Sequence, residues 1–72
     1  MRLKDLREDN DLTQEQVAII LNCARNTYSQ YENGKRQIPT EILIKLSRFY
    51  KTSIDYILDE TDEIKPYKRK NK

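Results

Sequence analysis

Two short helical patterns meet at a tight corner between Thr13 and Arg36, and this arrangement constrains the fold more than any other stretch of the chain. Thr13, with Gln16 three residues later, forms a capping box, which predicts that a helix begins there. The apolar residues spaced to share its inner face are Val17, Ala18 and Leu21. Asn22 adopts the left-handed conformation more readily than any residue but glycine, so it can end this helix and turn the chain.

The second pattern predicts a helix from about Ala24 to Glu32, which Asn33-Gly34 stops. Tyr28 and Tyr31 are three residues apart and point inward. The outer face has no core to fill, and its side chains are those of Arg25, Asn26, Thr27, Ser29 and Gln30. Arg, Asn and Gln can make paired hydrogen bonds to guanine and adenine edges in the major groove of DNA.

Apolar residues recur with helical spacing along the rest of the chain as well. Leu3 and Leu6 predict a first helix that ends near Asp9. A fourth helix is expected with Pro39 in its first turn. Its buried stripe consists of Leu43, Leu46 and either Phe49 or Tyr50, flanked by Ile42 and Ile44. Ser53 can cap a fifth helix, which carries Ile54, Ile57 and Leu58. The sequence therefore predicts an all-α domain of five helices over residues 1–62, followed by a basic, flexible tail over residues 63–72.

Length and charge limit what such a domain can bind. A chain of 72 residues makes one small domain that buries only about 60% of its unfolded surface, which leaves little room for a deep pocket. No small-molecule ligand is expected. The net charge is +2, but residues 65–72 carry five basic groups and no acidic ones. The remaining nine basic residues stand against all twelve acidic ones, so residues 1–64 have a net charge of −3. A DNA-binding surface must therefore be a local patch.

Several classes of function lack the residues that they need. The chain contains no histidine, so the usual general base and metal ligand is missing. Gly34 is the only glycine, which excludes a glycine-rich phosphate loop. Cys23 is the only cysteine; it excludes an internal disulfide, fits a reducing cytoplasm, and is best interpreted as a small core residue. No window resembles a signal peptide or a membrane span. We expect a cytoplasmic protein that is not an enzyme, has no cofactor, metal or membrane partner, and binds through its surface.

The chain resembles the phage-repressor-like (XRE-type) helix-turn-helix family, whose five-helix DNA-binding domain is shared by the lambda and 434 repressors and Cro proteins. Gln14, Ala18, the corner at Asn22, the inward Tyr28 and the ending E-N-G-K-R carry the resemblance in the motif. The stretch I-P-T-E-I-L-I-K-L-S-R-F-Y-K-T-S-I-D-Y-I-L-D-E-T-D is similar to the fourth and fifth helices of small bacterial members, so the likeness covers residues 3–62. Three positions depart from the family pattern. Asn22 replaces the corner glycine, Cys23 replaces a valine or threonine, and Ala24 replaces a capping serine or threonine.

The resemblance implies a role for each polar position. The base-reading residues would be Arg25, Asn26, Thr27 and Gln30, with Ser29 at their margin. The phosphate-binding residues would be Gln14 with the start of its helix on one side, and Asn33, Lys35 and Arg36 on the other. Arg7 and Glu32 would form a partly buried structural ion pair. The alternative interpretation is that the polar residues of both sets bind nothing and are simply solvated on the surface of amphipathic helices and the turn that follows.

The resemblance also implies a function: a sequence-specific DNA-binding transcriptional regulator, acting as a repressor in a bacterium, phage or mobile element. Members of the family bind double-stranded DNA as homodimers on near-palindromic operators. The alternative is a protein-interaction or antitoxin-like adaptor that keeps the fold. The polar recognition face favours DNA, because an adaptor would present apolar anchors there. The basic residues of the tail, Lys65, Lys68, Arg69, Lys70 and Lys72, could follow DNA phosphates or simply solubilise the chain end.

Overall fold

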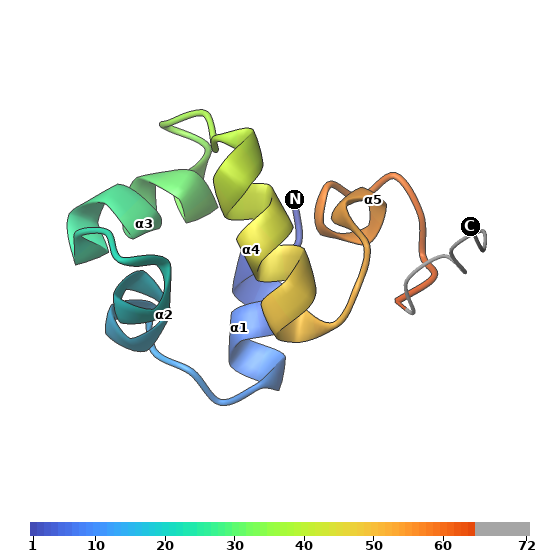
Figure 1. The fold of residues 1–72 in the computed structure, drawn as a ribbon, viewed down its shortest axis with the longest axis horizontal. Helices are drawn as coiled ribbons and strands as arrows, with labels where there is room; N and C mark the ends of the chain where they lie inside the picture. Colours follow the sequence, from blue (N-terminus) through green and yellow to red (C-terminus); the bar gives the residue numbers. More distant parts are fainter. Residues whose placement is uncertain (65–72) are drawn as a thin grey trace, which may run out of the picture.

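A computed structural model describes residues 1–64 of the chain as an all-helical fold (Figure 1). The five helices are α1 Leu3–Asp9, α2 Gln14–Leu21, α3 Arg25–Asn33, α4 Thr40–Tyr50 and α5 Ile54–Ile57. This confirms the predicted five-helix, lambda-repressor-like architecture with a helix-turn-helix at α2 and α3. None of these helices is long and apolar enough to cross a membrane. The basic tail residues 65–72 lie outside the described part, so their role stays a prediction.

The corner between α2 and α3 forms through the local signals in the sequence. The hydroxyl of Thr13 accepts a hydrogen bond from the Gln16 N–H at 3.1 Å, and Gln16 Oε1 accepts one from the Thr13 N–H at 2.8 Å. Asn22 ends α2 in the left-handed conformation, with φ 59° and ψ 45°. Ala24 precedes α3 in an extended conformation and has no polar side chain to cap it. Gly34 ends α3 with φ 74°. Both ends of α2 and the end of α3 are therefore fixed by named caps, whereas the start of α3 is not.

The core gathers the inner faces of all five helices. Its buried apolar residues are Leu3, Leu6, Val17, Ala18, Leu21, Tyr28, Tyr31, Ile38, Leu46 and Ile57. The predicted inner faces of α1, α2 and α3 are confirmed by this set. Ile38 was not predicted; it reaches the core from the loop between α3 and α4. Cys23 packs against the core, as expected of a small apolar residue, and burial raises the pKa of its thiol despite the opposing charge of Lys45.

The fourth helix differs from the sequence prediction in detail. Leu46 is fully buried, and Tyr50 rather than Phe49 packs against the core; Phe49 remains 42% exposed. Pro39 has an extended ψ of 152° and lies just before α4 instead of in its first turn. The helix ends at Lys51, which adopts the left-handed conformation with φ 57° although it is neither glycine nor asparagine.

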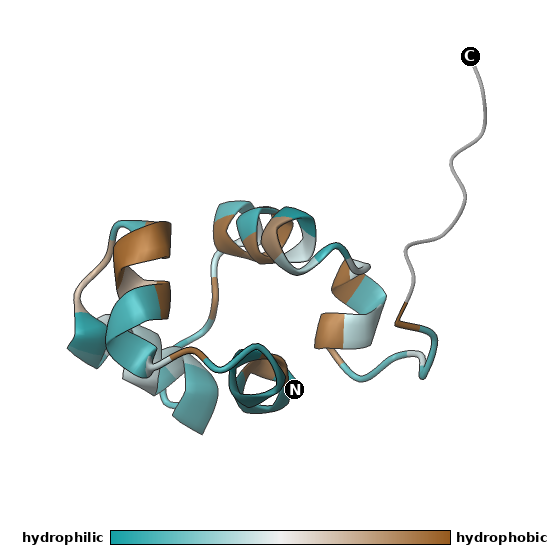
Figure 2. Ribbon diagram, turned by 90° about the horizontal axis from the view of Figure 1, so that it is seen from below, coloured by the Kyte–Doolittle hydropathy of each residue, from teal (hydrophilic) through white to brown (hydrophobic). Residues whose placement is uncertain are grey.

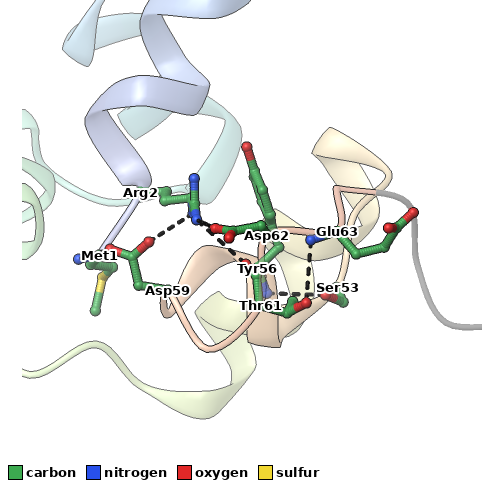
Figure 3. A network of polar contacts seen from close by, with 8 residues as sticks. All are labelled: Met1, Arg2, Ser53, Tyr56, Asp59, Thr61, Asp62 and Glu63. Carbon is green, nitrogen blue, oxygen red and sulfur yellow. Dashed lines mark hydrogen bonds and ion pairs between the residues drawn. The ribbon is translucent and has the colours of Figure 1, made fainter.

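Arg2 joins the start of the chain to the segment that follows α5, a contact that the sequence did not predict (Figure 3). Its Nε lies 2.8 Å from Asp59 Oδ1, and its Nη2 donates to Asp62 Oδ1 at 2.7 Å. The guanidinium also stands 4.3 Å from the centre of the Tyr56 ring. The backbone N–H of Arg2 donates a hydrogen bond to the backbone carbonyl of Ile57 at 2.8 Å. These contacts hold the acidic segment after α5 at the opposite end of the molecule from α2 and α3 (Figure 1).

Candidate nucleic-acid interface

The outer face of α3 is polar along its whole length. Apart from the two buried tyrosines, the residues of this helix are polar or charged, in contrast to the apolar second half of α2 beside it (Figure 2). Tyr28 and Tyr31 are buried, which turns the other side of α3 to solvent. Arg25 and Asn26 are exposed there, and Thr27, Ser29 and Gln30 are half-buried. The helix thus presents side chains that can pair with base edges, on a surface where they fill no core.

The start of α2 and the start of α3 border the same depression. A hollow of about 430 Å³ is lined by Gln14, Arg25, Asn26 and Ser29. An adjoining hollow shares Gln14 and Arg25 and extends to Thr13. The structure therefore brings the expected phosphate-binding Gln14 next to two of the expected base-reading residues. Ser29, expected at the margin of the base-reading set, lines this hollow as well.

The first turn of α2 leaves backbone donors available at this depression. The capping box satisfies the N–H groups of Thr13 and Gln16. The N–H groups of Gln14 and Glu15 have no carbonyl one turn earlier in the helix to pair with. A helix N-terminus with free N–H groups and a positive dipole attracts anions such as phosphate. This end of α2 can therefore contact a phosphate without a basic side chain.

Arg7 and Glu32 form a nearly buried ion pair behind the interface. Arg7 Nε lies 2.7 Å from Glu32 Oε2, and the two side chains are only 13% and 4% exposed. Arg7 Nη2 donates to Glu32 Oε1 at 3.3 Å, and Nη1 donates to the Leu12 carbonyl at 3.0 Å. The pair thus connects α1, the loop before α2, and the last turn of α3. It fixes α3 against the rest of the domain and is turned away from solvent, unlike a residue that reads bases.

Gln14 belongs to the same network. Its Nε2 donates to Glu32 Oε1 at 3.1 Å, so the carboxylate holds the amide in place. Because a carboxylate only accepts hydrogen bonds, the contacting atom must be the amide nitrogen. One hydrogen of that nitrogen remains free to contact a phosphate. The ion pair therefore also orients a residue of the expected phosphate-binding set.

The protonation states of this cluster follow from its burial and its charges. Burial acts to raise the pKa of Glu32, but the hydrogen bonds from Arg7 and Gln14 outweigh it and lower the pKa, and the nearby Tyr28 hydroxyl acts in the same direction. The Glu32 hydrogen bond raises the pKa of Arg7 in spite of partial burial. Burial, reinforced by the charge of Glu32, raises the pKa of Tyr28 strongly and that of Tyr50 to about 12. Both phenols are therefore neutral near pH 7, and Arg7 and Glu32 carry the charges of the cluster.

The loop after α3 folds back onto the helix. The N–H groups of Lys35 and Arg36 both point to the Gln30 carbonyl, at 2.9 and 3.3 Å. Arg36 Nε also donates to Gln30 Oε1 at 2.8 Å. Asn33, Lys35 and Arg36 are all exposed at this end of α3. The expected phosphate-binding loop is therefore attached directly to a residue of the expected base-reading set, a link that no local sequence signal predicted.

Comparisons with known proteins place the chain in a family. A family model described as "Helix-turn-helix" matches residues 3–57. The chain belongs to this helix-turn-helix family. The matched residues include all five helices described above and both members of the Arg7–Glu32 pair. No solved structure shows a significant match to the chain.

Three relatives illustrate the family. The uncharacterized HTH-type transcriptional regulator YobD of Bacillus subtilis (strain 168) is 41% identical over 97% of this chain and 63% of its own length. The HTH-type transcriptional regulator ImmR of the same organism is 41% identical over 88% of this chain and 49% of its own. The cryptic phage CTXphi transcriptional repressor RstR of Vibrio cholerae is 34% identical over 85% of this chain and 55% of its own. The chain thus matches between about half and two thirds of the length of each relative.

Proposed function

We propose that this chain is a sequence-specific DNA-binding transcriptional regulator that inserts α3 into the major groove. It acts as a repressor in the bacterial cytoplasm and is encoded by a bacterium, a phage or a mobile element. The observation that carries the proposal is the outer face of α3. It is wholly polar and carries arginine and amide side chains outside the core. Relatives named as HTH-type transcriptional regulators, and one named as a phage repressor, support the same function.

The base-reading residues divide by chemistry. Arg25 pairs with the O6 and N7 acceptors of guanine, and Asn26 pairs with the N6 donor and N7 acceptor of adenine. Gln30, whose Oε1 already accepts a hydrogen bond from Arg36, donates through Nε2 to an acceptor such as adenine N7. The Thr27 methyl group contacts a thymine methyl. In helix-turn-helix proteins the N-terminal residues of the recognition helix meet the base edges, and Arg25, Asn26 and Thr27 form the first turn of α3.

Phosphate contacts flank this reading face on both sides. Gln14 and the first N–H groups of α2 bind one phosphate, while Asn33, Lys35 and Arg36 bind others beyond the end of α3. Such contacts fix the register of the protein on the duplex but carry no direct sequence information. The acidic residues around α5 lie at the far end of the molecule, away from the DNA (Figure 1). This separation lets a domain of negative net charge present a positive patch.

A homodimer on a near-palindromic operator completes the proposal. Residues 1–64 contain one recognition helix, which reads only one short half-site. Two copies related by a two-fold axis place their α3 helices in successive major grooves, about 34 Å apart. The operator is then expected to consist of two inverted half-sites whose centres are separated by about one helical turn.

A selection from random double-stranded DNA at moderate salt tests the proposal. The wild-type chain is expected to enrich a motif with inverted symmetry. Arg25→Ala should lose enrichment at one base position in each half-site. Arg48→Ala serves as a matched control, because Arg48 is an exposed arginine in the last turn of α4 and not on α3. A wild-type selection without an enriched motif would refute the regulator function and favour a protein-interaction module that kept the fold.

A further inference from the structure

Arg36 holds Gln30 at two points. Its backbone N–H points to the Gln30 carbonyl at 3.3 Å, and its side-chain Nε donates to Gln30 Oε1 at 2.8 Å. Gly34 makes the reversal of the chain possible, since its φ of 74° belongs to the left-handed region. The Lys35 N–H also binds the Gln30 carbonyl, at 2.9 Å. The loop geometry is therefore fixed by the backbone, and it places the Arg36 side chain beside the Gln30 amide.

This contact determines the orientation of the Gln30 side-chain amide, that is, whether its oxygen or its nitrogen faces Arg36. A guanidinium has only N–H donors, so the atom that it contacts must be the amide oxygen and not the nitrogen. An unrestrained glutamine side chain on a surface can rotate its amide and present either its donor or its acceptor. With Oε1 tied to Arg36, the Nε2 group is left as the hydrogen-bonding group that projects from the pair.

We propose that Arg36 is a positioning residue that orients Gln30 to donate a hydrogen bond to a base edge in the major groove. The inference rests on the proposed DNA-reading function. The N7 and O6 atoms of guanine, N7 of adenine and O4 of thymine accept such a bond. Cytosine presents an N4 amino group, which is a donor. Gln30 therefore selects against cytosine at the base that it faces, and this selection depends on Arg36.

Arg36 can do this while it also contacts a phosphate. The guanidinium carries five N–H donors, and only the one on Nε is used by Gln30. Among residues 1–64 no other hydrogen-bond partner contacts the four N–H groups on Nη1 and Nη2, so they are available to a phosphate oxygen. Binding of the DNA backbone by Arg36 is thereby coupled to the orientation of a base-reading side chain. A lysine at this position would keep the charge but would lose the planar donor arrangement.

The decisive variants are R36K, Q30A and their combination, with K35A as the matched control that removes a neighbouring exposed charge. Selections and titrations use the full chain. Q30A identifies the base position that Gln30 faces. R36K is expected to keep its affinity for random DNA and its salt dependence, yet to lose about fivefold of the preference at that position, as expected for one hydrogen bond of about 1 kcal/mol. The double variant should match Q30A there. K35A should weaken binding to all sequences and leave the preference intact.

A DNA-free measurement tests the contact itself. In nitrogen-resolved NMR spectra, Q30A should move the Arg36 Nε–H signal, and R36K should move the Gln30 side-chain amide signals, whereas K35A should move neither. Unmoved signals would overturn the inference. The inference would also be overturned if the wild type enriched a motif and R36K kept the full preference at the Gln30 position. That result would leave the proposed function intact. Absence of any selection by the wild type would refute the function and this inference together.

Discussion

Replacing Arg7 with methionine should destabilise the domain severely, because it leaves a buried carboxylate without its partner. The Glu32 side chain is only 4% exposed, and Arg7 supplies its 2.7 Å contact from α1. Methionine keeps most of the length and the apolar stem of arginine, so the change tests the charge and its hydrogen bonds more than packing. Gln14 remains as a neutral donor, which cannot balance the charge of Glu32.

The expected loss in the free energy of unfolding is about 3–5 kcal/mol at neutral pH, the usual cost of breaking a buried pair from one side. A small domain has a total stability near the lower end of the range of about 5–15 kcal/mol. The variant should therefore be barely folded at 25 °C. The double variant R7M/E32Q removes both charges and should lose clearly less than R7M alone, since an unpaired buried charge costs more than a neutral amide.

The dependence on pH distinguishes lost charge from lost packing. In the wild type the pKa of Glu32 lies below its ordinary value of 4.5. A lowered pKa contributes stability that is fully present above the unfolded-state pKa and is lost as the pH falls through the folded-state pKa. In R7M burial dominates and the pKa of Glu32 rises, so protonation at acid pH relieves the penalty. The stability difference between the two proteins should be largest near pH 7. It should begin to shrink as the pH falls through the raised pKa of Glu32 in R7M, above 4.5, and continue to shrink until the pH is below the lowered pKa of the wild type.

Urea unfolding followed by circular dichroism, repeated at several pH values, measures this difference. Arg48→Met is the control, because Arg48 is exposed and its loss should change stability by less than about 0.5 kcal/mol. A loss below about 1 kcal/mol for R7M would show that the pair behaves like a surface ion pair. A loss that stays constant with pH would assign the effect to packing. Either result would refute the reasoning from the buried charge.

Three further predictions concern the interface. Arg25→Ala should cost about 1–3 kcal/mol of binding free energy on the selected operator and relax the preference at one base position, as measured by fluorescence anisotropy with a panel of operator variants. Lys35→Ala should weaken binding to all sequences about equally, and the slope of log affinity against log salt concentration should fall by about one unit. Ala24→Ser should raise the free energy of unfolding by about 1 kcal/mol, read from the urea midpoint, because the extended backbone at this position suits a capping serine.

The helices and their inner faces could be predicted because short-range signals specify them. The capping box at Thr13, the left-handed Asn22 and the stop at Gly34 all appear where the sequence places them. Each signal depends on residues within one turn of the helix, so no knowledge of the rest of the fold is needed. The family resemblance then supplied the expectation that Arg7 and Glu32 would meet, 25 residues apart along the chain.

Other features depend on tertiary packing and could not be predicted. Phe49 and Tyr50 follow Leu46 by three and four residues, so helical spacing alone allowed either to point inward. Lys51 ends α4 in a conformation that lysine does not signal, and the Thr52 N–H secures the turn by donating to the Ser47 carbonyl at 2.9 Å. Arg2 forms an ion pair with Asp59, which lies near the other end of the described part of the chain. No pattern of neighbouring residues in the sequence predicts such a contact.

The two ends of α3 are anchored unequally, and this asymmetry bears on the proposed reading of DNA by the helix. At its C-terminal end Glu32 is tied to Arg7, Gly34 reverses the chain, and Arg36 holds Gln30. At its N-terminal end Ala24 provides no cap, so the first N–H groups of α3 have no side-chain acceptor. Arg25 stands at this uncapped end and lines the same hollow as Gln14, which is expected to bind phosphate. A phosphate bound at the start of α3 would satisfy these free donors, so the DNA that we propose as the ligand would supply the cap that the sequence omits.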